Sequence, residues 1–179
     1  LAVTALLITV AALLAAPEGP EPAKDVLARA RAKAAQGNRN VLLVYHASWC
    51  GWCRKLEAFL AAPEIKPVID RHFEVAFLTV QERGAKQKLD NPGAAEMMAK
   101  LSGGRNVAGL PFYAVLDPKG QPLGTSLVAA AGGEPGNLGF PGTPDEIQAF
   151  VALVKRTAPS ATGAELETLR KGLEERMPK

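Results

Sequence analysis

Blocks of apolar residues separated by polar stretches run along most of the chain, and their spacing predicts alternating helices and strands. Residues 22–36 have the spacing of an amphipathic helix, and Gly37 stands where such a helix would end. Three short apolar runs have the composition of buried strands. These runs are residues 41–46, 73–80 and 112–116.

Further helices are predicted between these strands. Residues 56–60 carry apolar side chains three and four positions apart, which is typical of one face of a helix. Pro63 and Pro67 interrupt the pattern that follows, so a second short helix is expected to end near Arg71.

Recognisable start signals mark the later helices. Asn91 followed by Pro92 predicts the N-cap and first position of a helix that runs to about Leu101. Thr-x-x-Glu capping boxes then open the last two helices. They begin at Thr143 and Thr162.

Polar and glycine-rich segments connect these elements. Residues 81–91 are polar and charged, which predicts an exposed loop. Residues 117–120 form a strong turn signal, so residues 121–128 are expected to return as the hairpin partner of the third strand. Residues 129–142 hold five Gly and two Pro. They predict a flexible loop that is either a simple connector or a flap over a substrate groove.

The order of these elements predicts an α/β fold. A strand–helix–strand unit that ends in a hairpin gives a mixed sheet, partly parallel and partly antiparallel, with helices on both faces. The expected divisions are a linker with an N-terminal helix (17–37), a main domain (38–157) and a C-terminal helical extension (158–179).

The first sixteen residues have a different character. Residues 1–16 are apolar and uncharged, and the chain then switches abruptly to a proline-rich stretch. Such a run resembles the hydrophobic region of a secretory signal, with Ala15 and Ala16 at the cleavage position. We therefore expect a periplasmic or secreted protein. An uncleaved membrane anchor and a buried core helix are the alternatives.

Composition and charge narrow the classes of function. The 21 Lys and Arg are interspersed with 18 Asp and Glu, and aromatic residues make up 6% of the chain. This pattern gives no support for nucleic-acid binding. Two cysteines exclude a disulfide-stapled scaffold and a zinc site with four thiolates, and no cofactor or metal is expected.

Those two cysteines, Cys50 and Cys53, stand between a predicted strand and a predicted helix. Unpaired N–H groups and the dipole at a helix N-terminus stabilise a thiolate, so Cys50 is predicted to be exposed and to act as the nucleophile. Cys53, one turn further on, can resolve a mixed disulfide by closing a bond to Cys50. Buried thiols, or half of a soft-metal site shared between two chains, are the alternatives.

The run Trp-Cys-Gly-Trp-Cys at 49–53, with Leu110 and Pro111 before the third strand, resembles the thioredoxin superfamily. The resemblance covers roughly residues 38–157 and is closest to exported bacterial members. It implies a three-layer α/β/α fold with a mixed central sheet. It also implies a cis peptide bond at Pro111, with Leu110 and Pro111 shaping the substrate-binding surface beside the cysteines.

Two departures from the superfamily pattern concern proton transfer. Its members carry a buried carboxylate six residues before the first cysteine, where this chain has Val44. The lysine that cytosolic thioredoxin has on the next strand is replaced here by Phe77. Deprotonation of Cys53 must then rely on water or another base. His46 is a candidate for tuning the Cys50 thiolate, because histidine titrates near neutral pH. A strand-end residue without a redox role is the alternative.

The residues that flank the cysteines are predicted to shape the site. Trp49 is expected to pack over the site and shield it. Gly51 and Trp52 separate the two cysteines, and Trp52 is expected to be exposed. Its ring either offers an apolar contact to a partner polypeptide or covers the start of the helix.

Together these observations predict a monomeric thiol–disulfide oxidoreductase that acts on protein thiols and disulfides outside the cytoplasm. A reductase that is recharged by a membrane-bound redox partner is the first interpretation. A disulfide oxidase or isomerase is an alternative within the same class. A redox-inactive binding module with the same fold is an alternative from another class.

Overall fold

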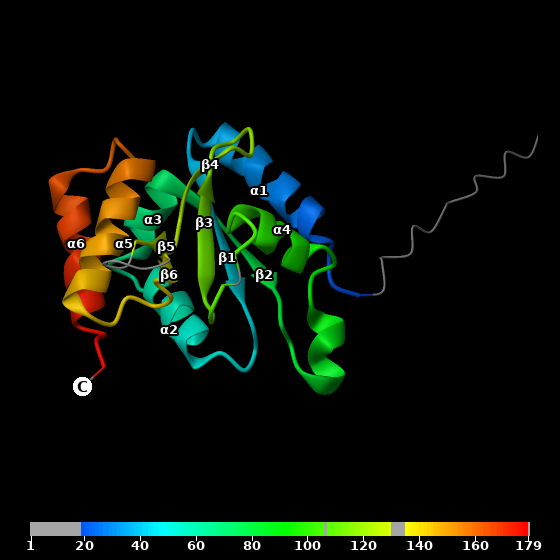
Figure 1. The fold of residues 1–179 in the computed structure, drawn as a ribbon. Helices are drawn as coiled ribbons and strands as arrows, with labels where there is room; N and C mark the ends of the chain where they lie inside the picture. The colour runs from blue at the N-terminus through cyan, green and yellow to red at the C-terminus, as the bar shows by residue number, and fades with distance from the viewer. Residues whose placement is uncertain (1–18, 106, 130–134, 179) are drawn as a thin grey trace, which may run out of the picture.

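The computed structural model describes residues 19–105, 107–129 and 135–178, so the predicted signal or anchor at 1–16 lies outside the described residues. Helices and strands alternate as the sequence predicts (Figure 1). The helices are α1 (Ala23–Gln36), α2 (Gly51–Leu60), α3 (Lys66–His72), α4 (Ala94–Leu101), α5 (Pro144–Thr157) and α6 (Gly163–Glu174), with a 3-10 turn η1 (Gly84–Leu89). The strands are β1 (Asn40–His46), β2 (Phe73–Thr79), β3 (Phe112–Leu116), β4 (Pro122–Thr125), β5 (Leu127–Val128) and β6 (Gly136–Asn137).

The central sheet has the strand order β2-β1-β3-β4. Strand β1 pairs in parallel with β2 and antiparallel with β3, and β3 pairs antiparallel with β4, so the predicted mixed sheet is confirmed. Helices α1 and α4 cover one face, and α3, α5 and α6 cover the other (Figure 1). This arrangement is the expected three-layer α/β/α fold.

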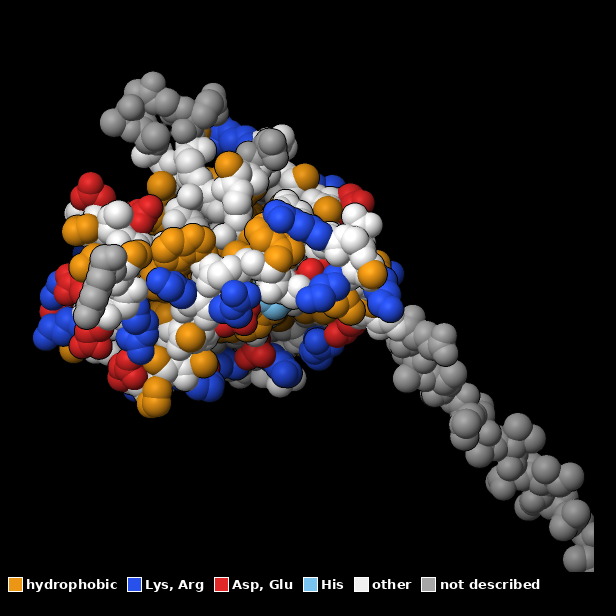
Figure 2. Space-filling model, turned by 90° about the horizontal axis from the view of Figure 1, so that it is seen from below, with side chains coloured by type: hydrophobic (Ala, Val, Ile, Leu, Met, Phe, Trp, Pro, Cys, Tyr) orange, Lys and Arg blue, Asp and Glu red, His pale blue; other side chains and the backbone are white. Residues whose placement is uncertain are grey.

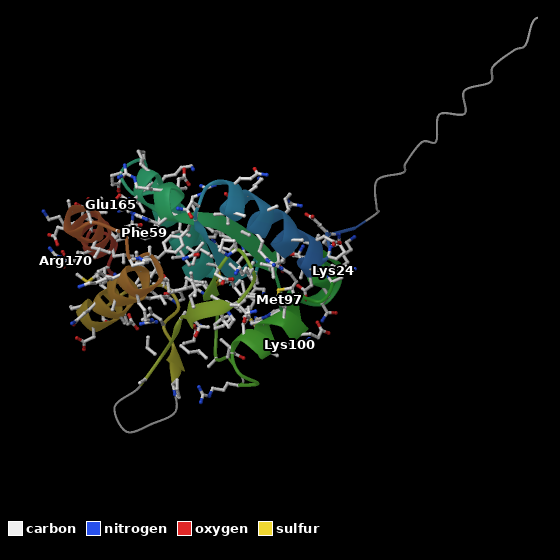
Figure 3. All side chains as sticks on the ribbon, turned by 90° about the horizontal axis from the view of Figure 1, so that it is seen from above. Lys24, Phe59, Met97, Lys100, Glu165 and Arg170 are labelled. Carbon is white, nitrogen blue, oxygen red and sulfur yellow. A yellow bond between two sulfur atoms is a disulfide. The ribbon has the colours of Figure 1, made fainter. Side chains whose placement is uncertain are left out.

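Each face of the sheet buries its own hydrophobic core, because successive side chains of β1 point to opposite faces. Leu42 and Val44 point into the core under α5 and α6, and Leu43 and Tyr45 point into the core under α1 and α4. The first core is rich in Phe and Leu, with Phe59 fully buried at its centre (Figure 3). The second core is rich in Ala and Val and contains both cysteines.

The predicted start of α4 at Asn91 is wrong. The helix begins at Ala94, after Gly93 in the left-handed conformation (φ 80°). The Asn91 side chain is occupied elsewhere, because its oxygen accepts from the Thr79 N–H and its amide donates to the Glu21 carbonyl. It therefore ties α4 to β2 and to the segment before α1 instead of capping a helix.

The predicted return strand at 121–128 is correct only in its first part. Residues 122–125 pair with β3, whereas β5 leaves the sheet and pairs with β6 in a separate two-stranded sheet. The chain changes partner at Ser126, whose N–H donates to the Tyr113 carbonyl and whose carbonyl accepts from the Leu138 N–H.

Local signals for helix boundaries are accurate for α1, α5 and α6. The capping boxes at Thr143 and Thr162 are both present, and each closes onto the Glu three residues later. Helix α1 ends at Gly37, as predicted. Among the described residues, no helix has the length and apolarity needed to cross a membrane.

Candidate active site

Cys50 and Cys53 lie where β1 runs into α2, at the lower end of the sheet (Figure 1). Cys50 is the N-cap of α2, as predicted, and the backbone N–H of Cys53 donates to its Sγ at 3.0 Å. The two cysteines form a disulfide. The Sγ of Cys50 therefore lies at the positive end of the helix dipole and also accepts a hydrogen bond from an N–H of the first helical turn.

The predicted exposure of Cys50 is wrong for this state. Cys50 is 3% exposed and Cys53 is 1% exposed. Cys50 is covered by the segment that precedes β3, which contains Leu110 and Pro111. The Leu110–Pro111 peptide bond is cis, and the Leu110 carbonyl oxygen lies 3.4 Å from the Sγ of Cys50. Leu110 is itself buried in the same core as the disulfide.

Asn137 of β6 holds that segment in place. Its side-chain amide donates to the Gly109 and Pro111 carbonyls, each at 3.0 Å. Its side-chain oxygen accepts from the hydroxyl of Ser126 at 2.7 Å, and that hydroxyl accepts from the backbone of β3. Asn137 thus hydrogen-bonds to the backbone carbonyls of the residues before and after Leu110. Sequence reasoning missed this residue, because a glycine-rich segment gives no local signal of a distant contact.

The described part of the segment 129–142 reaches Trp52, which stands between the two cysteines in sequence. Phe140 is 5% exposed and its ring stacks on Trp52, with ring centroids 6.0 Å apart. Trp52 is 47% exposed, as predicted. The ammonium of Lys55 lies over its ring, 4.6 Å from the ring centroid. A groove of about 360 Å³ lies between Trp52, Leu110 and Phe140. The segment therefore forms one wall of a groove beside the disulfide.

Trp49 directly precedes Cys50 in sequence, and its side chain is 39% exposed. Its indole N–H donates to the Gln81 carbonyl, and the guanidinium of Arg83 lies 4.0 Å from its ring centroid. The contacts of Trp49 are therefore with the segment that follows β2.

Residues 81 and 83–89 are exposed, as predicted for this segment, but Glu82 is an exception and is only 4% exposed. Its carboxylate accepts from the backbone N–H and the hydroxyl of Ser48. The bond from the Ser48 N–H lowers the pKa of the Glu82 carboxyl, and the charge of Lys86 adds to this effect. A signal was available, because the carboxyl ends of the parallel strands β1 and β2 meet at one edge of the sheet.

His46, the last residue of β1, also lies at this edge. Its Nδ1 is 2.6 Å from the Glu57 carboxylate of α2, and its Nε2 is 3.3 Å from the Thr79 hydroxyl. Both ring nitrogens thus have partners other than sulfur. His46 and Glu57 line a cavity of about 400 Å³ whose wall includes Phe77. In the sheet, Val44 of β1 pairs directly with Phe77 of β2. These are the two positions at which thioredoxins were expected to carry a buried carboxylate and a lysine, and both are apolar here.

Gly51 opens α2 and is exposed. It lies with Trp52 between the two cysteines, whose sulfurs are bonded to each other. Within the described ranges, no group of three or more His, Cys, Asp or Glu side chains could hold a metal ion.

Comparison with known proteins agrees with this geometry. The family model described as thioredoxin-like matches residues 23–118, which include the cysteine pair and the cis-proline segment. The chain therefore belongs to the thioredoxin-like family. No curated protein sequence matches it.

Several solved structures are similar in fold. A disulphide isomerase from Xylella fastidiosa Temecula1 is 18% identical, covering 93% of this chain and 98% of that one, with a TM-score of 0.49. A DsbH oxidoreductase is 20% identical, covering 88% and 96%, with a TM-score of 0.46. A thioredoxin from Thermus thermophilus is 22% identical, covering 60% and 72%, with a TM-score of 0.38.

Proposed function

We propose that this protein is a thiol–disulfide oxidoreductase that reduces disulfides of other proteins outside the cytoplasm. The observation that carries the proposal is the position of the Cys50–Cys53 disulfide at the N-terminus of α2, with the Cys53 N–H donating to the Cys50 sulfur. When the pair is reduced, the same N–H and the helix dipole stabilise a thiolate on Cys50. Membership of the thioredoxin-like family supports the same chemistry.

The reaction proceeds by two exchanges of sulfur bonds. The Cys50 thiolate attacks one sulfur of a substrate disulfide, so that a bond forms between Cys50 and the substrate while the substrate disulfide breaks. The departing substrate thiolate takes a proton from water. Cys53, as a thiolate, then attacks the Sγ of Cys50 and releases the second substrate thiol. Two electrons pass to the substrate, and the Cys50–Cys53 disulfide is the oxidised product.

The oxidised pair must then be reduced for another turnover. An external dithiol can do this by the same two exchanges in reverse, and a membrane-bound redox protein is the source we propose. The proposal of an exported protein rests on the apolar residues 1–16 and the proline-rich stretch that follows them.

Residues around the disulfide have distinct roles in this proposal. Leu110 lines the groove that takes the substrate chain, with Pro111 buried next to it, and Trp52 forms the adjoining wall of the groove. Trp49 and Gly51 are the exposed neighbours of Cys50 in sequence and border the path of the substrate sulfur to Cys50. Both ring nitrogens of His46 are hydrogen-bonded to groups other than sulfur, so its effect on the Cys50 thiolate is electrostatic. The proton of Cys53 passes to water.

Three variants test the proposal through the reduction of insulin disulfides by dithiothreitol. Cys50→Ser abolishes the acceleration, because no nucleophile remains. Cys53→Ser also stops turnover but leaves Cys50 able to form a stable mixed disulfide, which non-reducing electrophoresis detects. Ser160→Ala, near the start of α6, is the matched control and keeps the activity. An unmodified protein that does not accelerate the reaction, or a Cys50→Ser variant that still does, contradicts the proposal.

A further inference from the structure

The face that surrounds Cys50 carries positive charge that no carboxylate of the described chain neutralises. Arg54, Lys55 and Arg83 are exposed, and their contacts are with uncharged groups. The guanidinium of Arg54 donates to the Ser48 carbonyl at 2.9 Å. The ammonium of Lys55 lies over the ring of Trp52, and the guanidinium of Arg83 lies over the ring of Trp49. These partners position the cations and leave their charge available.

The carboxylates near this face are already engaged inside the protein. Glu57 binds His46 at 2.6 Å, and Glu82 accepts from the backbone and hydroxyl of Ser48. Glu146 accepts from two backbone N–H groups before α5, in the capping box. These carboxylates keep their charge but turn their oxygens toward donors inside the protein. Lys86, whose ammonium donates to the Ser48 hydroxyl, adds a further exposed cation to the same rim, so the rim of the site attracts an anion.

The same three cations lie beside the exposed aromatic surface. Trp49 and Trp52 are two of the exposed large hydrophobic side chains of the described chain, and they flank Cys50 and Gly51 in sequence. Figure 2 views the molecule from this end and shows blue Lys and Arg side chains directly beside orange hydrophobic ones. A surface of this kind fits an extended chain that combines apolar and acidic side chains.

We infer that the partner polypeptide presents its reactive cysteine within an acidic segment, with Asp or Glu on both sides of it. The inference deepens the proposed function and rests on it. Carboxylates before and after the partner's cysteine meet Arg83 on the Trp49 side and Lys55 on the Trp52 side, while Arg54 lies between them, beside Ser48 and Gly51. They guide the partner sulfur toward the Sγ of Cys50 for the exchange described above.

Two synthetic peptides of equal length test the inference. Each carries one cysteine as a mixed disulfide with thionitrobenzoate, flanked on both sides by two Asp residues in one peptide and by two Lys residues in the other. The second-order rate constant for attack by the reduced protein is followed by release of the coloured thiolate. We expect the acidic peptide to react about tenfold faster at low ionic strength, and added salt to narrow the gap.

A triple variant assigns this preference to the named cations. Arg54→Gln, Lys55→Gln and Arg83→Gln together are expected to remove most of the preference. The ratio of the two rates is the readout, because a change in the reactivity of Cys50 alters both rates equally. The matched control removes three exposed lysines from other elements, Lys24 of α1, Lys100 of α4 and Lys119 of the β3–β4 turn, and keeps the ratio (Figure 3 labels the first two).

The outcomes separate this inference from the proposed function. Equal rates for both peptides, a preference that survives in the triple variant, or one that disappears in the control overturn the inference and leave the oxidoreductase proposal intact. If neither peptide reacts with the reduced protein, the proposed function fails and the inference fails with it. If the triple variant does not fold, the salt dependence of the two rates in the unmodified protein still tests the inference.

Discussion

Two histidine–glutamate pairs at opposite ends of β2 serve different purposes. His46 and Glu57 meet at the end that carries the cysteines, where the two side chains are 26% and 37% exposed and line an open cavity. His72 and Glu165 meet at the other end, where α3 packs against α6 and the two side chains are 5% and 12% exposed. The same chemical pair is open to solvent in one place and buried in the other.

The surroundings of the two pairs explain the difference. Glu165 also closes the capping box of α6, and the Thr162 N–H lowers the pKa of its carboxyl with a smaller contribution from His72. The His72–Glu165 pair therefore joins the last helix, α6, to α3. His46 and Glu57 instead join the end of β1 to α2, one helical turn beyond Cys53. We infer that the α6 end provides stability, while the cysteine end provides reactivity.

The largest expected effect tests the stabilising end. Phe59 extends from α2 into the core under α5 and α6, where it is fully buried, packs edge to face on Phe150 of α5 and lies beside Gly172 of α6. Phe59→Ala is expected to cost about 3–5 kcal/mol in the free energy of unfolding, because it leaves a cavity in the larger core. Chemical denaturation measures this loss. The matched variant Trp52→Ala removes an exposed aromatic ring and is expected to cost much less. Similar losses for both variants would contradict the division of roles.

Asn137→Ala tests whether the cysteine end depends on its supports. The variant removes both donors from the carbonyls on either side of Leu110, so the segment against Cys50 loses its fixed position. We expect kcat/KM in insulin reduction to fall about tenfold, equivalent to about 1.4 kcal/mol in the transition state. Asn137→Asp has nearly the same shape but cannot donate, and is expected to resemble the alanine variant. Full activity in both variants would show that this contact has no role in the reaction.

The two histidines can be compared directly. His72→Ala is expected to destabilise the protein by about 1–3 kcal/mol, since it removes a buried side chain and a partner of Glu165. His46→Ala is expected to cost less than about 1 kcal/mol, because its pair is solvent-exposed. His46→Ala is also expected to raise the pH at which Cys50 is alkylated, whereas His72→Ala leaves that pH unchanged. If the alkylation profile does not move in His46→Ala, this histidine does not tune the thiolate.

The smallest expected effect concerns Glu82 and acid. The folded protein lowers the pKa of its carboxyl below the ordinary 4.5, so the ionised form stabilises the fold at any pH above 4.5. This contribution disappears as the pH falls through the lowered folded value. Glu82→Gln should therefore lower Tm at neutral pH, and the difference from the unmodified protein should shrink as the pH falls below 4.5 and through the lowered folded pKa. A difference in Tm that is constant with pH would show that the charge of Glu82 contributes nothing.

Much of the fold follows from local patterns in the sequence. The capping boxes at Thr143 and Thr162, the glycine after α1 and the apolar run of β1 are all short-range signals, and each element forms where they stand. The cysteine pair at the strand–helix junction is recognisable for the same reason. The resemblance to thioredoxins, rather than any local pattern, predicts the cis bond at Pro111.

The remaining features of the site depend on contacts between distant segments. Cys50 is buried because Leu110, sixty positions later in the chain, lies against it. Glu82 acquires its partner Ser48 only when β2 pairs with β1. Asn137 acquires its partners only when β6 lies against the segment before β3. Asn91 has the residue type that favours a helix cap, but its bonds to Thr79 and Glu21 take precedence. No short-range pattern encodes such contacts.

The redox equilibrium of the Cys50–Cys53 pair provides the most direct test of the proposed function. The protein is equilibrated with a graded series of reduced and oxidised dithiothreitol or glutathione, and its free thiols are trapped by alkylation and counted by mass. We predict reversible opening and closing of the disulfide with a midpoint near the roughly −270 mV of thioredoxin. A midpoint near the roughly −120 mV of strong periplasmic oxidants would contradict the proposed direction of electron flow. A pair that never exchanges reversibly would contradict the oxidoreductase function itself.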